Sequence, residues 1–193
     1  FKCPYRAFLS KTIRLNQREE GEVSSLSVGN LMHEILRKFV KRLNEITDRN
    51  SSDEVFSQVV NEVLSRKEFA KYLIDPVTNA DLSRAIWECK EYCYKVYLSM
   101  QNSKYKVKET EVTFGSGETD KYPAILLNGG KVSLKGKIDR VDESQDDFRI
   151  IDYKTGKIDA SEEKLYYGEE LQLYLYAAAV EGGEKGKKAA GLY

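Results

Sequence analysis

The amino-acid sequence predicts an α/β protein, because its hydrophobic periodicity changes once, near residue 104. Before that position, apolar residues recur every three or four residues, as in amphipathic helices. From Lys104 onward, KVKETEVTFG alternates in the manner of a strand, and a short second strand is expected over 124–127. A later apolar stretch, EELQLYLYAAAV, predicts a closing helix over 168–180.

The composition fits a single domain. The chain has 193 residues, of which 41% are hydrophobic, and this is enough for a sizeable core. Lys+Arg and Asp+Glu both number 31, so any contact with nucleic acid must be a local basic patch. No apolar run reaches the ~18 residues of a membrane-spanning helix. Three cysteines favour a reducing compartment, so we expect a cytoplasmic location.

The chain is expected to be a fragment of a larger protein, because it does not begin with Met and its last residues, KKAAGLY, resemble the start of a strand. We divide residues 1–193, taken as one domain, into an N-terminal docking segment over 1–26, a helical part over 27–103 and a sheet core over 104–193.

Three helices are expected in the helical part. Ser27 can cap the first, which runs to about Leu43. Others are expected over 52–74 and 80–100. Cys89 and Cys93 lie four apart on the apolar stripe of the third helix, which favours core packing over metal binding.

The one histidine, His33, lies at the edge of the first apolar stripe. A lone histidine in such a place is more often packed or solvated than a ligand. Gly29, within the first turn of the same helix, costs ~1 kcal/mol relative to Ala. Its presence there favours the close approach of another group at this helix end.

The densest group of chemically useful residues lies in KGKIDRVDESQDDFRIIDYKTG, residues 135–156. LKGKIDRVD alternates loosely, FRIIDYK is apolar and β-branched up to its charges, and the polar ESQDD between them predicts a turn, which together indicate a β-hairpin. Asp152 and Lys154 are two apart and share a face. A turn near Gln145 brings Asp139 beside them.

Two carboxylates and an ammonium group at the end of a buried strand suit metal-dependent phosphodiester cleavage, because Mg²⁺ prefers oxygen ligands. Glu109 and Glu111 on the preceding strand could support the metal from its outer shell. The alternative is a surface hairpin with solvated charges, where an Asp–Lys pair adds ~0–1 kcal/mol.

Gln172 and Tyr176 are spaced i, i+4 on the last helix and share a face. A glutamine on an otherwise apolar helix needs a partner, either the backbone or a substrate phosphate. The following EGGEKGKK misses the spacing of a phosphate-binding P-loop, so ATP hydrolysis is not expected of this chain.

These residues, in order, resemble the PD-(D/E)xK nucleases of the RecB-like branch, which carry a helix histidine, a GxxDRvD strand, a DYKtG strand and a QxxxY helix. The resemblance spans residues 27–181. FKCPYRAFLSKTIRL and YYGEELQLYLYAAAV also resemble AddB-like subunits of ATP-dependent helicase/deoxyribonucleases, specifically their C-terminal nuclease domain. The resemblance implies a restriction-endonuclease-like core, with a central mixed β-sheet flanked by helices and an N-terminal helical extension.

The resemblance also implies site roles. Asp139 and Asp152 match metal-binding carboxylates, Lys154 matches the catalytic lysine and His33 matches a further ligand. The main-chain carbonyl of Tyr153 commonly completes such sites. Gln172 and Tyr176 match the motif that contacts DNA and supports the site, with Glu111 as further support. The expected ion is Mg²⁺, which Mn²⁺ can replace because imidazole suits Mn²⁺.

The implied function is a metal-dependent DNA exonuclease that acts on single strands fed by a helicase–nuclease complex in double-strand break repair and recombination. The implied partner is an AddA-like helicase–nuclease subunit. The alternatives are a catalytically silent DNA-binding or scaffold module of the same fold, and a CRISPR-adaptation or phage exonuclease of the same branch.

Two further features remain open. Cys3 matches the first cysteine of an iron–sulfur site in many AddB-like proteins, whose other three cysteines follow the nuclease core, so a 4Fe–4S cluster is implied only for a full-length protein. Some of the basic residues near the expected site could contact the DNA backbone. They are Arg37, Lys38, Lys41, Arg42, Lys135, Lys137, Arg140, Lys157 and Lys164.

Overall fold

A computed structural model describes residues 25–70, 76–117, 120–154, 171–184 and 186–192, with single positions at Tyr5, Phe8, Thr12 and Tyr167. The docking segment expected over 1–26, with Cys3, therefore lies outside the described residues except at its end. The same is true of Lys157 and Lys164. No helix among the described residues is long and apolar enough to cross a membrane.

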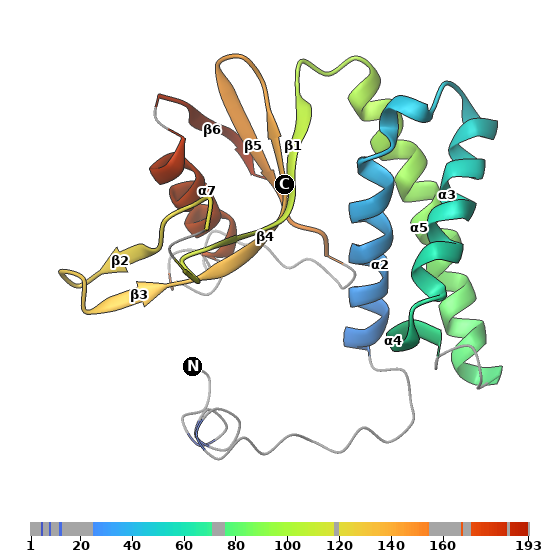
Figure 1. Cartoon of the computed structure of the whole chain (residues 1–193), viewed down its shortest axis with the longest axis horizontal. Helices are drawn as coiled ribbons and strands as arrows, with labels where there is room; N and C mark the ends of the chain where they lie inside the picture. The colour runs from blue at the N-terminus through green and yellow to red at the C-terminus, as the bar shows by residue number, and fades with distance from the viewer. Residues whose placement is uncertain are drawn as a thin grey trace.

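Three long helices form the first layer (Figure 1). Helix α2 spans Ser25–Val40 and is followed by a 3-10 turn, η2, at Leu43–Glu45. Helix α3 spans Arg49–Leu64 and the short α4 spans Lys67–Ala70. Helix α5 spans Pro76–Gln101.

The helix boundaries differ from the predicted ones for local reasons. Helix α3 starts before residue 52 because Asp48 caps its N-terminus. The Asp48 carboxylate accepts a hydrogen bond from the Ser51 amide at 2.8 Å, and the Ser51 hydroxyl accepts one from the Asp48 amide. Helix α5 begins at Pro76, since the first helical position needs no amide hydrogen. The single helix predicted over 52–74 is divided after Leu64.

The helices share one apolar core. Leu31, Ile35 and Phe39 of α2 are fully buried, and they pack with residues of α3 and α5. Cys89 and Cys93 are fully buried free thiols in this core, and burial raises the pKa of the Cys93 thiol. Core packing of both cysteines is thus the observed arrangement.

The second layer is a four-stranded mixed sheet in the order β1-β4-β5-β6. Strands β1 (Lys106–Phe114), β4 (Gly136–Glu143) and β5 (Asp147–Ile151) are antiparallel neighbours, and β6 (Lys188–Leu192) runs parallel to β5. A separate hairpin, β2 (Ile125–Leu127) with β3 (Val132–Leu134), extends from it. The predicted hairpin turn is present, with the Ser144 amide donating to the Asp147 carbonyl at 2.8 Å.

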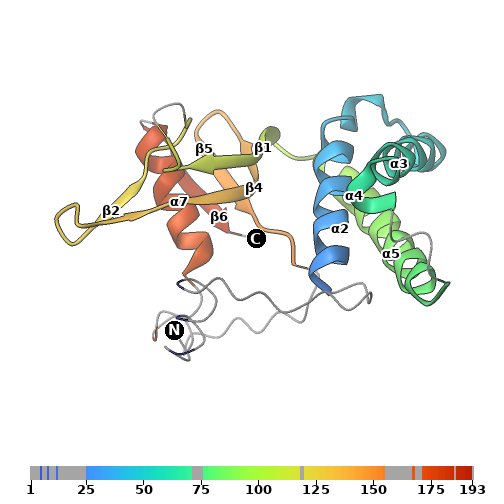
Figure 2. The same ribbon diagram turned by 60° about the horizontal axis from the view of Figure 1, so that its bottom comes forward.

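Helix α7, Gln172–Gly183, covers the sheet opposite the helical layer, so the sheet lies between α7 and the group of α2, α3 and α5 (Figures 1 and 2). Phe114, Ile138 and Ile150 of the sheet pack with Tyr176 and Val180 of α7. This is the predicted restriction-endonuclease-like arrangement of a central mixed sheet flanked by helices.

Candidate active site

A histidine and two carboxylates from three different elements converge between α2 and the sheet. His33 comes from α2, Glu111 from β1 and Asp139 from β4. The His33 Nδ1 atom lies 3.4 Å from Asp139 Oδ1 and 3.9 Å from Glu111 Oε1. One ligand atom from each of the three residues lies within 4.8 Å of the others. The side chains form a compact acidic and imidazole cluster, called here the His33 cluster.

The backbone of Tyr153 fixes two members of this cluster. The Tyr153 amide donates to Asp139 Oδ2 at 2.8 Å, and His33 Nε2 donates to the Tyr153 carbonyl at 2.8 Å. Asp139 Oδ1 is then directed at the imidazole. The hydrogen bond to Asp139 raises the pKa of His33, although partial burial opposes that shift.

The other residues of the predicted hairpin motif form a second, adjoining network. Lys154 Nζ is ion-paired with Asp152 and donates to Gln172 Oε1 at 2.8 Å. The Gln172 amide nitrogen donates to Asp152 Oδ1 at 3.1 Å and contacts the Tyr176 hydroxyl at 2.7 Å. Because Lys154 can only donate and ionised Asp152 can only accept, this network also sets which way round the glutamine amide lies.

The surroundings of Asp152 raise the pKa of its carboxyl group. Desolvation raises the pKa of its carboxyl group and the nearby charge of Asp139 adds to that effect, while the Lys154 ammonium opposes it. The hydrogen-bond partners of Gln172 are neighbouring side chains and not the backbone. The Asp152 carboxylate interacts with Lys154 and Gln172, whereas Glu111 is the third member of the His33 cluster.

Glu111 reaches the cluster through an unusual backbone conformation. Its φ angle is 55°, in the left-handed region that non-glycine residues rarely adopt. The β1–β4 register, with Thr110 opposite Arg140 and Val112 opposite Ile138, sets Glu111 across from Asp139. Its carboxylate is also ion-paired with Lys137.

Glu109 does not join the cluster. The ladder is irregular between Val107 and Glu109, and the Glu109 carboxylate is ion-paired with Lys121 instead. The two glutamates are two positions apart on one strand, but their carboxylates have different partners. The expectation that Glu109 supports a metal from its outer shell has no support in the described contacts.

The donor set fits a hard divalent cation. It offers carboxylate oxygens, a main-chain carbonyl and an imidazole, which together suit Mg²⁺ or Mn²⁺. The 2.8 Å between His33 Nε2 and the Tyr153 carbonyl oxygen is close to the ~3 Å expected between adjacent ligands of an octahedral ion with bonds of about 2.1 Å. Both atoms could contact one ion, but Asp139 and Glu111 face the other ring nitrogen, Nδ1, so a single ion that takes all these ligands requires the imidazole to turn.

Comparison with known proteins identifies the family. A family model described as the PD-(D/E)XK nuclease superfamily matches residues 2–193. The chain belongs to the PD-(D/E)XK nuclease superfamily.

Curated relatives are described as the B subunit of an ATP-dependent helicase/deoxyribonuclease. That of Symbiobacterium thermophilum is 34% identical over 94% of this chain. Those of Clostridioides difficile and Alkaliphilus metalliredigens are 31% identical over 93% and 28% identical over 96%. The predicted resemblance to AddB-like proteins is confirmed. The chain spans only 16–17% of the length of these relatives.

Next to the candidate site lies a buried cluster of charged residues that the sequence analysis did not predict. Asp142 is fully buried and accepts from Arg140 Nε at 2.6 Å, from Arg140 Nη2 at 2.8 Å and from Arg149 Nε at 2.9 Å. The Met100 sulfur accepts from both arginines. Arg140 Nη1 also lies 3.4 Å from the Tyr153 hydroxyl.

This cluster corrects one expectation. Arg140 is among the basic residues that could contact DNA by sequence, but it is 3% exposed and bound to Asp142. The second aspartate of DRVD was the available signal, because a carboxylate two residues from an arginine on one strand shares its face. Tyr153 connects the two clusters, with its backbone at the site and its ring in the helical core.

Proposed function

We propose that this chain is a metal-dependent deoxyribonuclease domain that hydrolyses phosphodiester bonds of DNA as an exonuclease. The observation that carries the proposal is the His33 cluster beside the Lys154 ammonium, in a chain that belongs to a nuclease superfamily. Carboxylates and imidazole can hold the cation, and an exposed ammonium within the same site can act on the substrate.

In this proposal His33, Asp139, Asp152 and the Tyr153 carbonyl hold Mg²⁺, or Mn²⁺ in its place, and Glu111 assists them. The bound ion would supply positive charge that stabilises the negative charge growing on the phosphate. Its binding requires neutral imidazole, so His33 must lose the proton that its Asp139 hydrogen bond favours.

Lys154 is the proposed catalytic cation of the protein itself. Its side chain is 47% exposed, so it can reach the reacting phosphate, and it orients the attacking water or offsets developing charge. Gln172 limits the motion of this ammonium through its 2.8 Å hydrogen bond, and Tyr176 supports Gln172 from the next turn of α7. DNA contact by Gln172 and Tyr176 is part of the proposal.

The biological setting follows from the relatives, which are described as helicase/deoxyribonuclease subunits. We propose that the domain degrades single strands delivered by an AddA-like helicase–nuclease subunit, in double-strand break repair and recombination. A cytoplasmic location fits the free thiols of Cys89 and Cys93. A 4Fe–4S cluster that involves Cys3 is proposed only for a full-length protein.

The test is a nuclease assay on labelled single-stranded DNA with EDTA, Mg²⁺ or Mn²⁺. We compare the wild type with Lys154→Ala and with Lys131→Ala, a control that removes an exposed lysine outside the site. We expect metal-dependent cutting that Lys154→Ala lowers by at least ~10²-fold, the usual size of a positioned proton-transfer or charge contribution. The control should cut like the wild type.

Calorimetry with Mn²⁺ separates binding from catalysis. Lys154→Ala should bind Mn²⁺ with the affinity of the wild type, whereas Asp139→Ala should bind it more weakly. Full activity of Lys154→Ala would contradict the assigned role. DNA binding by the wild type without cutting in either metal would instead favour a silent DNA-binding module of the same fold.

A further inference from the structure

Three adjoining hollows line the outer edge of β1. Their volumes are about 330, 310 and 490 Å³. The first two share Val40 and Lys41, the first and third share Lys106, and all three share Val107. They therefore form one continuous depression, called here the β1 groove, which begins between the ends of α2 and α5 and strand β1 and extends to the β4–β5 turn and Lys187.

The groove begins beside the candidate active site. One of its lining residues, Thr110, directly precedes Glu111 of the His33 cluster. On α2, Val40 of the groove follows His33 by seven residues, so both lie on one helix face about 10 Å apart, and Lys41 comes directly after the helix. On β1, Lys106 precedes Glu111 by five residues, about 16 Å of strand. A chain that leaves the site can therefore continue along the groove.

β1 is also an edge strand of its sheet. It pairs with β4 on one side, and in the described chain its other side is paired only at its end, by a single bridge between Phe114 and Tyr122. An unpaired strand edge presents backbone amide groups. In the groove these amides lie among lysine side chains, which is a suitable lining for a phosphate backbone.

Ion pairs select one of the four basic residues in the last turn of α2 and directly after it. Three have acidic partners: Arg37 with Glu34, Lys38 with Glu62 and Arg42 with Glu45. In the described part of the chain, Lys41 has no acidic partner, and it lines the groove. The sequence alone could not choose among these four.

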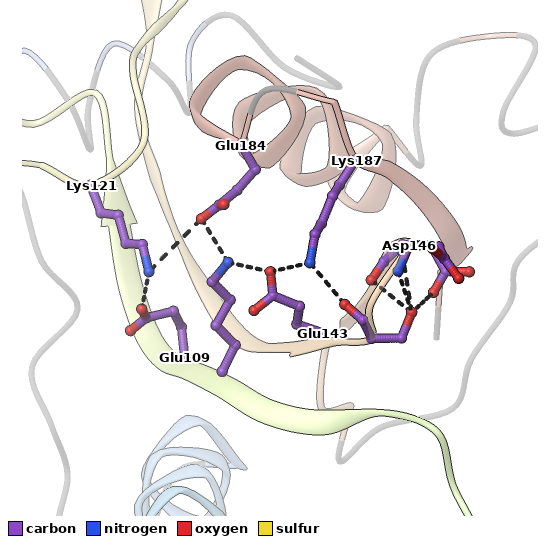
Figure 3. A network of polar contacts seen from close by, with 9 residues as sticks. Glu109, Lys121, Glu143, Asp146, Glu184 and Lys187 are labelled. Atoms are coloured by element: carbon purple, nitrogen blue, oxygen red, sulfur yellow. Dashed lines mark hydrogen bonds and ion pairs between the residues drawn. The ribbon is translucent and has the colours of Figure 1, made fainter.

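Lys106 is the second lysine of the groove without an acidic partner among the described residues. The others are neutralised. Lys104 pairs with Asp147 at 2.7 Å. Lys108 and Lys187 share Glu143, and Lys108 also reaches Glu184, as part of the network in Figure 3. In a chain of zero net charge, this leaves two uncompensated ammonium groups in one depression that begins at the candidate site.

We propose that the β1 groove binds the sugar–phosphate backbone of single-stranded DNA, with Lys41 and Lys106 as its phosphate contacts. The proposal rests on the proposed function, which supplies the substrate, and adds the path by which the strand approaches the metal site. Lysine–phosphate contacts carry no sequence information, so this path is independent of base sequence.

The test measures binding apart from catalysis, in EDTA, with a labelled single strand of about 20 nucleotides, longer than one module usually covers. The variant is Lys41→Gln with Lys106→Gln. The matched control is Lys95→Gln with Lys131→Gln, which removes the same charge from two exposed lysines outside the groove. The Kd is measured over a series of salt concentrations, and thermal melting confirms that all proteins are folded.

Loss of two phosphate contacts on a single strand should reduce the slope of log K against log salt by ~1.4. At about 0.1 M salt this corresponds to a roughly 20-fold weaker Kd. The control pair should retain the wild-type slope. Hydrolysis of a small phosphodiester, bis-p-nitrophenyl phosphate, should be unchanged in the groove variant, because that probe needs the site alone.

A groove variant with the wild-type slope and Kd would overturn the proposal. An equal loss of affinity and salt slope in the control pair would also overturn it. Failure of the nuclease function is a separate result. It appears as absent metal-dependent hydrolysis by the wild type, and the salt slope still reports on the groove in that case.

Discussion

Asp142→Asn tests the charge cluster behind the site. The substitution keeps the shape of the side chain but removes the carboxylate charge that pairs with Arg140 and Arg149, which are only 3% and 18% exposed. Removing one partner of a buried ion pair costs ~3–5 kcal/mol, because the remaining charge stays desolvated. In a domain of this size each kcal/mol lowers Tm by ~2–4 °C, so we expect a decrease of roughly 6–20 °C.

The assay is urea denaturation combined with thermal melting. Its control is the neighbouring Glu143→Gln, which also removes a carboxylate with two lysine partners, but one that is 28% exposed. Solvent-exposed pairs contribute ~0–1 kcal/mol, so the two variants should differ by at least ~2 kcal/mol. Equal losses, or an Asp142→Asn protein within ~1 kcal/mol of the wild type, would refute the argument that burial makes this cluster important.

Two other predictions concern the second network and the sheet. Gln172→Ala should lower kcat by about 10–100-fold, since it removes hydrogen bonds to charged groups of ~1.5–3 kcal/mol. The Mn²⁺ isotherm should stay unchanged, and Tyr176→Phe, which deletes one partner of Gln172, should have a smaller effect on kcat. The Lys104 ammonium and the Ser144 hydroxyl hold the pKa of Asp147 at about 2, below its ordinary 3.8. This stabilisation is complete above pH ~4 and is lost as the pH falls toward 2, so the stability difference between wild type and Asp147→Asn should shrink over that interval in acid denaturation.

Periodicity predicted the architecture because helices and strands of this chain are amphipathic along most of their length. The helix of His33, the hairpin with its turn at residues 144–147 and the closing helix are all present. Their ends were less predictable. Asp48 begins α3 earlier through a cap, and the residues just before the predicted hairpin form a separate strand, β3, which ends at Leu134 and pairs with β2.

The site was predictable where its residues are close in sequence. Asp152 and Lys154 are ion-paired as the predicted shared face requires, although β5 ends at Ile151, just before them. The role of Glu111 in the cluster was harder to predict, because its backbone adopts a left-handed angle. The pairing of Arg140 with Asp142 had a local signal, but the contacts of Arg140 and Arg149 with Met100 span 40 or more residues and leave no local pattern.

The contact of His33 with Tyr153 joins residues 120 positions apart. The candidate cation site therefore forms only after the helical layer has docked on the sheet, and an ion that bound there would add its binding free energy to that docking. At 100 times its Kd such an ion would stabilise the docked state by ~2.7 kcal/mol. The same residues would thus keep a partly folded chain from acting on DNA, since a chain with its layers apart has no complete site.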